Sequence, residues 1–123
     1  MNSNKLVWID HQEARIFEVA PDKQDVTTVS APKHHVHRHP KGANAEHNHP
    51  DDVMRFYDEV ARALEGASHI LLVGPSNAKL HFLRHLSRHH LKLDAQVVGI
   101  ETVDHPSDGQ LFAHAKRYFG IST

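Results

Sequence analysis

A continuous apolar run near the middle of the chain constrains the fold most. Residues 69–73 read HILLV, with four large aliphatic side chains in succession. Successive side chains of a β-strand point to opposite faces of a sheet, so a strand of this composition is buried on both faces. Because further layers of structure must then cover each face, the run predicts a sheet with helices packed against it.

The segments around this run alternate between strand and helix patterns. Three β-prone runs precede it and are separated by short polar turns, as in antiparallel hairpins: residues 5–9, 14–19 and 26–29. A helix is predicted from Pro50 to Gly66, because its apolar residues recur at helical spacing: Val53, Phe56, Tyr57, Val60, Ala61 and Leu64. A second helix follows the turn at 74–77, with an inner side formed by Ala78, Phe82, Leu83 and Leu86.

The last third of the chain predicts one more strand and one more helix. Residues 96–100, QVVGI, indicate another buried strand, and Ser107 to Gln110 has the S-x-x-Q form of a capping box that opens a helix to Phe119. Three antiparallel strands followed by α-β-α-β-α predict an α/β fold. We expect an RNase H-like mixed sheet of about five strands, with helices on the sheet faces and the first strand beside the fourth. We also expect one domain over residues 1–123, with an exposed histidine-rich loop at about 31–50.

Composition excludes several classes of protein. Hydrophobic residues make up 39% and charged residues 24% of the chain, as in globular proteins. No apolar run approaches the ~20 residues that span a bilayer, and the first ten residues lack the apolar stretch of a signal peptide. The chain has no cysteine, which excludes disulfides and thiolate metal sites. We therefore expect a cytoplasmic protein without a membrane partner, and the sequence leaves its oligomeric state open.

The histidine-rich segment at 33–50, KHHVHRHPKGANAEHNHP, is the most unusual local feature. Six of its eighteen residues are histidine, and it has no carboxylate before Glu46. Imidazole titrates near physiological pH and is the commonest protein ligand for metals. The segment therefore suits a cationic arm, a metal trap, or a solvated loop without a partner.

Acidic residues are also missing from residues 66–93, which contain Arg84 and Arg88. Such segregation of charge suggests a basic face, although ordinary scatter in a small chain gives the same pattern. An RNA-binding surface would combine the basic residues of both acid-free stretches: Lys33, His34, His35, His37, Arg38, His39 and Lys41, with Arg84 and Arg88 in support. Binding of phosphates by such residues falls steeply with salt.

Metal binding is the alternative for the same segment. Its candidate ligands are His35, His37, His39, His47 and His49. With neither cysteine nor a nearby aspartate, imidazole ligation would suit Zn²⁺, Ni²⁺ or Cu²⁺. On the second predicted helix, His81, His85 and His89 share one face at i, i+4 and i+8, so two of them could bind a metal. No motif requires a cofactor, and Zn²⁺ or Ni²⁺ could bind at the histidine-rich loop.

Two further patterns point to phosphate chemistry. The turn at 74–77 joins a strand to a helix N-terminus, which can hold a phosphate, but it lacks the P-loop consensus and is more often a compact connection. Asp10, Glu101 and Asp104, with His105, could converge as Mg²⁺ ligands of a nuclease. The alternative is that the two aspartates cap turns and that Glu101 is a charge at the rim.

The order of these elements resembles a known family. The chain is similar to the middle domain of eukaryotic and archaeal class-I peptide chain release factors and Pelota, and to small bacterial proteins known as translational machinery proteins. The resemblance covers roughly residues 5–119, and it rests on three pieces: Asp10 with Glu13-Ala14-Arg15, Gly74-Pro75 with Lys79 and Phe82, and residues 101–109.

The resemblance implies a function without catalysis. In release factors the loop after the third strand carries a Gly-Gly-Gln tripeptide that promotes ester hydrolysis, whereas the comparable region here reads Gly42-Ala43-Asn44-Ala45. The resemblance therefore implies association with the ribosome, tRNA or rRNA through a basic arm. We expect a non-enzymatic, translation-associated RNA-binding or ribosome-binding protein. The alternatives are a histidine-loop metal binder and a Mg²⁺-dependent nuclease.

Overall fold

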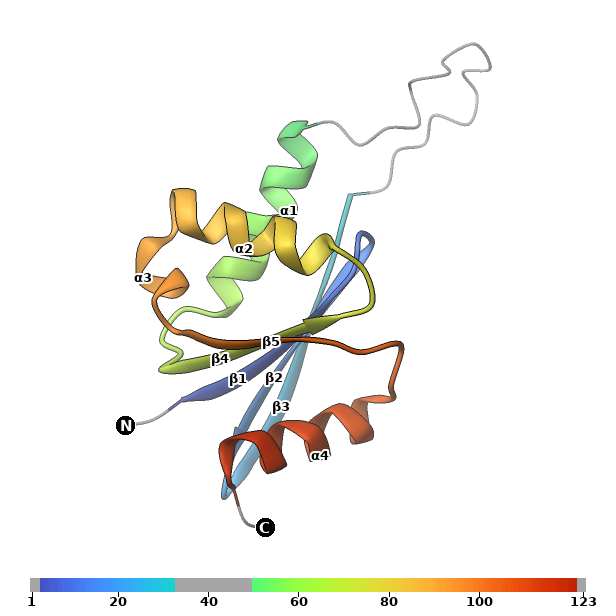
Figure 1. Ribbon diagram of the computed structural model, residues 1–123, viewed down its shortest axis with the longest axis vertical. Helices are drawn as coiled ribbons and strands as arrows, with labels where there is room; N and C mark the ends of the chain where they lie inside the picture. Colours follow the sequence, from blue (N-terminus) through green and yellow to red (C-terminus); the bar gives the residue numbers. More distant parts are fainter. Residues whose placement is uncertain (1–2, 33–49, 122–123) are drawn as a thin grey trace.

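The computed structural model describes residues 3–32 and 50–121, and they share one five-stranded sheet (Figure 1). The strands are β1 (Asn4–Ile9), β2 (Glu13–Ala20), β3 (Lys23–Ser30), β4 (His69–Gly74) and β5 (Val97–Thr102). The helices are α1 (Pro50–Ala63), α2 (Ala78–His89), α3 (Leu91–Asp94) and α4 (Asp108–Phe119).

The strand order is β3-β2-β1-β4-β5, so the first strand lies beside the fourth, as expected. β1 pairs antiparallel with β2, and β2 pairs antiparallel with β3. β4 runs parallel to β1 and to β5. The predicted mixed α/β sheet with helices on its faces is therefore confirmed.

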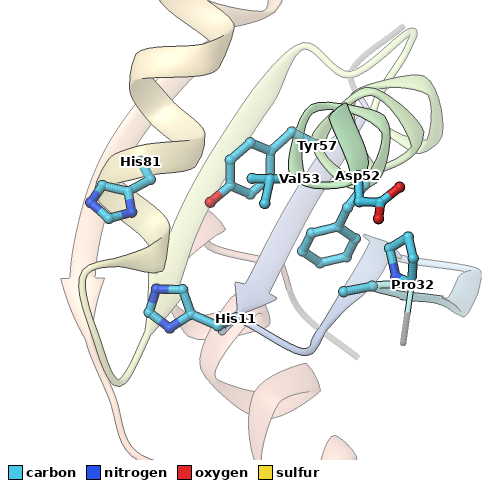
Figure 2. Close-up of a pocket in the computed structure, with 8 residues that line it drawn as sticks. His11, Pro32, Asp52, Val53, Tyr57 and His81 are labelled. Carbon is cyan, nitrogen blue, oxygen red and sulfur yellow. The ribbon is translucent and has the colours of Figure 1, made fainter. Parts of the chain in front are cut away.

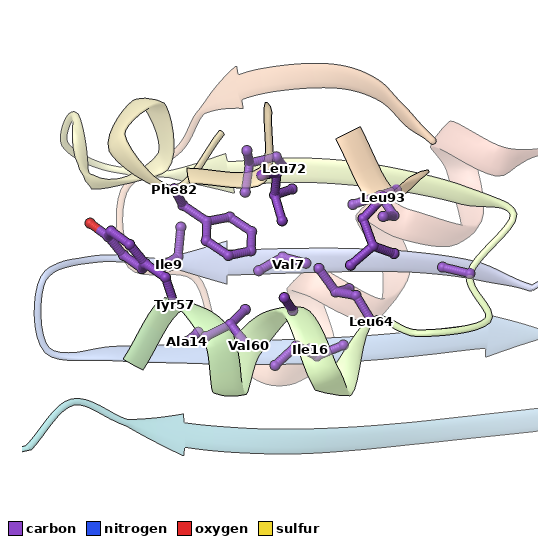
Figure 3. Packing of buried hydrophobic residues seen from close by; sticks show 14 of the residues in the cluster. Val7, Ile9, Ala14, Ile16, Tyr57, Val60, Leu64, Leu72, Phe82 and Leu93 are labelled. Atoms are coloured by element: carbon purple, nitrogen blue, oxygen red, sulfur yellow. The ribbon is translucent and has the colours of Figure 1, made fainter. Parts of the chain in front are cut away.

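The apolar run of β4 is buried on both faces, because a separate core lies on each side of the sheet. Ile70 and Leu72 belong to the core beneath α1 and α2, which Figure 3 shows from close by. Leu71 and Val73 belong to the core beneath α4, on the other face of the sheet (Figure 1). All four side chains are fully buried, and each contributes about 1.5–3 kcal/mol through removal from water.

The predicted helices form with the buried faces that their spacing indicates. In α1 the side chains of Phe56, Tyr57, Val60, Ala61 and Leu64 at its end are buried, and Val53 is partly buried. The capping box is present, because Gln110 N–H donates to Ser107 Oγ over 3.2 Å and Ser107 N–H donates to Gln110 Oε1 over 2.9 Å.

The prediction of a second fully buried strand at 96–100 is wrong. In the described part of the chain, β5 is an edge strand, and β4 is the one strand that pairs with it. Val98 is 46% exposed and Ile100 is 38% exposed, since nothing among the described residues covers the outer part of this strand. Aliphatic residues in succession indicate a strand, but they do not tell a central strand from an edge strand.

Candidate nucleic-acid interface

Three basic residues on α2 form an exposed stripe. The inner side of the helix buries Ala78, Phe82 and Leu86. His81, Arg84 and Arg88 are exposed, and their spacing of three and four residues places them on one face of the helix. We call these three residues the α2 stripe.

The two arginines of the stripe have no acidic partner in the described part of the chain. No ion pair joins Arg84 or Arg88 to a described carboxylate, and the surrounding residues 66–93 contain no aspartate or glutamate. An unpaired guanidinium offers several N–H donors in a geometry that matches a phosphate. The stripe can therefore bind an anionic backbone without first breaking an internal ion pair.

A cavity of about 210 Å³ lies at one end of this stripe. Figure 2 shows His11 and His81 at one end of the cavity and Pro32 and Asp52 at the other, with Val53 and Tyr57 between them. Ala31 and Phe56 complete its lining. His81 therefore belongs both to the stripe and to the cavity, so the two features form one continuous surface.

The polar end of the cavity contains two imidazoles and a phenol. The ring centroids of His11 and His81 are 6.1 Å apart, and the hydroxyl of Tyr57 points toward them (Figure 2). Burial raises the pKa of the Tyr57 hydroxyl, so the phenol is protonated at neutral pH. This end can donate and accept hydrogen bonds, whereas Val53 and Phe56 provide an apolar wall.

Most of the predicted binding residues fall outside the described residues. These are Lys33, His34, His35, His37, Arg38, His39 and Lys41 of the proposed RNA arm, and the further candidate metal ligands His47 and His49. Pro32, which lines the cavity, directly precedes this stretch in the chain. Of the predicted RNA-binding residues, Arg84 and Arg88 are described, and both are exposed on α2.

The turn before α2 is a compact connection. Lys79 is 5% exposed, and its Nζ donates to the carbonyl oxygens of Gly74 (3.1 Å) and Ser76 (2.7 Å). A Cβ at Gly74 would collide with the carbonyl oxygen of Ile9, so glycine allows β4 to run this close to β1. The lysine ammonium thus binds carbonyls of the turn itself, which accounts for this sequence without a phosphate.

The acids proposed as Mg²⁺ ligands of a nuclease do not form a group of three potential metal ligands among the described residues. Asp10 Oδ1 accepts hydrogen bonds from the backbone N–H groups of Gln12 (2.8 Å) and Glu13 (2.9 Å), so Asp10 caps the hairpin turn. Glu101 Oε1 lies 2.6 Å from Nε2 of His114. Asp104 Oδ1 lies 2.8 Å from Nδ1 of its neighbour His105. Each acid therefore has a separate local role.

Of His81, His85 and His89, two of which were predicted to bind a metal, the structure brings His85 and His89 together, with ring centroids 4.8 Å apart. Metal binding by this pair stays a prediction. His81 faces His11, whereas His85 is buried and turned toward α1. Within residues 3–32 and 50–121, the one group of three potential ligands is instead Asp58, His85 and His90. Helical spacing missed this group because His90 follows the last residue of α2, where the helical backbone ends.

Hydrogen bonds from His90 and His85 lower the pKa of the Asp58 carboxyl. Burial alone would raise the pKa of this carboxyl, but hydrogen bonds from His90 and His85 hold the pKa below its usual range. Asp58 is therefore a carboxylate at neutral pH, held between two imidazoles.

Comparison with solved structures finds the same fold within several larger proteins. The Pelota protein of Thermoplasma acidophilum matches 91% of the chain with a TM-score of 0.62 and 20% identity. This chain shares its fold with release-factor-like proteins. An archaeal translation termination factor, aRF1, matches 97% of the chain with a TM-score of 0.59 and 11% identity. Dom34 of S. cerevisiae, a translation termination-like factor involved in RNA quality control, matches 93% with a TM-score of 0.55 and 10% identity.

The likeness covers one part of each of these larger proteins. The chain spans 31% of the Thermoplasma Pelota, 39% of aRF1 and 35% of Dom34. No protein-family model matches the chain, and no curated protein matches it. The expected fold is confirmed by these neighbours, whereas the relation to the small bacterial proteins stays a prediction. No helix in the described part of the chain is long and apolar enough to cross a membrane.

Proposed function

We propose that this chain is a non-enzymatic, translation-associated protein that binds RNA on the ribosome. The α2 stripe carries the proposal, because it presents two exposed arginines that pair with no described carboxylate, and its His81 lines the same cavity as Pro32. The chain continues from Pro32 into the basic residues Lys33, Arg38 and Lys41. Ribosomal RNA or tRNA is the proposed partner, since both offer dense phosphates to basic residues.

The comparisons support a role in translation. Proteins of the same fold include a translation termination factor and a factor of RNA quality control. This chain spans only 39% and 35% of those proteins, so we transfer from them only the association with translation. Because we assign the protein to translation, we also place it in the cytoplasm.

The absence of catalysis is part of the proposal. The sequence has no Gly-Gly-Gln tripeptide, and Gly42 to Ala45 stands in the comparable region. The described acids that would have formed a nuclease site have separate local roles. Binding without hydrolysis is therefore the function that the residues support best.

Sedimentation with ribosomes tests the proposal. We expect the full chain to pellet with ribosomes at low salt, and Arg84→Ala/Arg88→Ala to pellet substantially less. Lys116→Ala/Arg117→Ala is the matched control, because it removes two cations from the last turn of α4 on the other face of the sheet. Equal loss in both double variants would mean that only net charge matters, and it would contradict a specific role for the α2 stripe.

A further inference from the structure

Three potential metal ligands meet where α1 packs against the end of α2. Asp58 Oδ1 lies 2.7 Å from Nε2 of His85 and 2.9 Å from Nε2 of His90. The three ligand atoms all lie within 4.8 Å of one another. This group is separate from the α2 stripe and from the histidine-rich segment, and the proposed RNA binding does not use it.

The end of α2 brings these side chains together. His90 follows the helix with φ −141° and ψ 63°, and its backbone N–H donates to the carbonyl oxygen of Leu86. The helical path therefore stops at His89, and His90 reaches the same carboxylate oxygen as His85. Two ligands from the end of α2 and one ligand from α1 thus converge across the contact between these two helices.

Packing holds the buried member of the group in place. The side chain of His85 is 6% exposed. Its ring packs against those of Tyr57, at a centroid distance of 5.4 Å, and His89, at 4.8 Å. A ligand whose ring is already fixed loses little conformational entropy when it binds a metal. His90 and Asp58 are partly exposed, at 30% and 44%, so solvent reaches the group from one side.

The geometry points to a site for a divalent transition metal, with Zn²⁺ as the best fit, at Asp58, His85 and His90. Zinc binds imidazole nitrogen and carboxylate oxygen at about 2.0–2.2 Å, so two ligand atoms of a tetrahedral site are about 3.4 Å apart. The observed separations of 2.7 and 2.9 Å need to widen only slightly to admit the ion. Two imidazoles and one carboxylate also match the donors that Zn²⁺ and its neighbours prefer over Mg²⁺ or Ca²⁺.

A hollow beside the group provides access and room for a water ligand. It has a volume of about 330 Å³, and its lining includes Asp58 and His90 together with Met54, Arg62, Glu65 and His89. A zinc ion here would link the middle of α1 to the junction of α2 and α3. Because only the folded chain assembles the three ligands, binding stabilises the fold. The proposed role is a structural clamp.

Zinc titration of a chain without the competing histidines tests the site. In a loop variant, the six histidines at 34, 35, 37, 39, 47 and 49 are replaced by serine. After chelator treatment, we expect calorimetry with Zn²⁺ to show one remaining site and the melting temperature to rise with Zn²⁺. Asp58→Asn or His90→Gln, added to the loop variant, should weaken binding at least tenfold. His105→Gln should leave it unchanged, because His105 is exposed and lies outside the group.

Circular dichroism before metal addition shows whether each variant folds. His90 is partly exposed and lies beyond the end of α2, so we expect His90→Gln to fold. If Asp58→Asn does not fold, the zinc affinity of His90→Gln alone tests the site. Loss of all Zn²⁺ binding in the loop variant overturns the proposal, because the metal then belongs to the histidine-rich segment. Equal affinity in the loop variant with and without His90→Gln overturns it as well.

Discussion

The imidazoles of His11 and His81 lie with their ring centroids 6.1 Å apart, at one end of the cavity beside α2. His11 belongs to the turn after β1, and His81 lies one turn into α2. The pair therefore joins the carboxyl end of the central strand to the α2 stripe. Because α/β sheets commonly bind ligands outside the carboxyl ends of their parallel strands, this is the part of the fold where an RNA contact is expected.

If Arg84 and Arg88 contact phosphates, their loss should reduce the salt dependence of RNA binding. Each phosphate contact to a single strand contributes about 0.7 to the slope of log K against log salt. Arg84→Ala/Arg88→Ala should therefore reduce the steepness of that slope by about 1.4, measured by fluorescence anisotropy with a labelled rRNA fragment. Lys116→Ala/Arg117→Ala should leave the slope unchanged, and a slope that stays the same in both variants would exclude these phosphate contacts.

Replacement of Phe82 should destabilise the core beneath α1 and α2. Phe82 is fully buried, and loss of a buried aromatic ring costs about 3–5 kcal/mol, because a cavity remains. Urea unfolding of Phe82→Ala should show this loss in the free energy of unfolding. Leu80→Ala is the control on the same helix, since Leu80 is 48% exposed and its loss should change stability by about 0.5 kcal/mol or less.

Two glycine substitutions should have opposite effects. Gly74→Ala should lower the free energy of unfolding by about 1–3 kcal/mol, because the new methyl group would collide with the carbonyl oxygen of Ile9. Gly109 lies in the first turn of α4, where a Cβ would meet Ser107 Oγ at 4.0 Å, an ordinary van der Waals contact. Gly109→Ala should therefore be neutral or should stabilise by up to about 1 kcal/mol. Thermal unfolding distinguishes the two, and equal stability of both variants would contradict the close approach of β4 to β1.

The buried phenol of Tyr57 should make stability fall in alkaline solution. Burial raises the pKa of this hydroxyl above the unfolded value of 10.0, so the folded chain holds the proton more tightly than the unfolded chain. The resulting stabilisation is complete below about pH 10 and is lost as the pH rises through the raised pKa. Tyr57→Phe should remove this part of the slope in urea unfolding between pH 9 and 11.

Tyr118→Phe is the control for this measurement. Tyr118 is 40% exposed and donates its hydroxyl proton to the carbonyl oxygen of Val98. Its variant should keep the alkaline loss of stability seen in the wild type. If Tyr57→Phe and the wild type lose stability in parallel, the phenol of Tyr57 is not the group responsible.

Sequence patterns predict the central parts of this fold well, because buried positions require apolar residues. Leu71 and Leu72 are both buried, as two successive aliphatic residues in a central strand must be. Ser107 and Gln110 form the capping box that their spacing indicates. Val98 looks the same as a core residue in the sequence, but its place in an edge strand depends on strand order, which no local pattern contains.

The residues of a candidate site could be predicted only where they lie on one face of the same helix. Arg84 and Arg88 are four residues apart, and they lie exposed on one face of α2 as expected. His85 and His90 are five residues apart, a spacing that places them on different faces of an uninterrupted helix. They meet at Asp58 because α2 ends between them and α1 crosses nearby, which is a tertiary effect.

Co-sedimentation of the full chain with ribosomes, compared with Lys33→Ala/Arg38→Ala/Lys41→Ala, tests the central proposal most directly. At low salt we predict that the wild type pellets with ribosomes, and that it does so more strongly at pH 6 than at pH 7.5, because protonated imidazoles add positive charge. The triple variant should bind much more weakly at both pH values. Absence of wild-type binding across this pH range, or equal binding by the triple variant, would contradict the account.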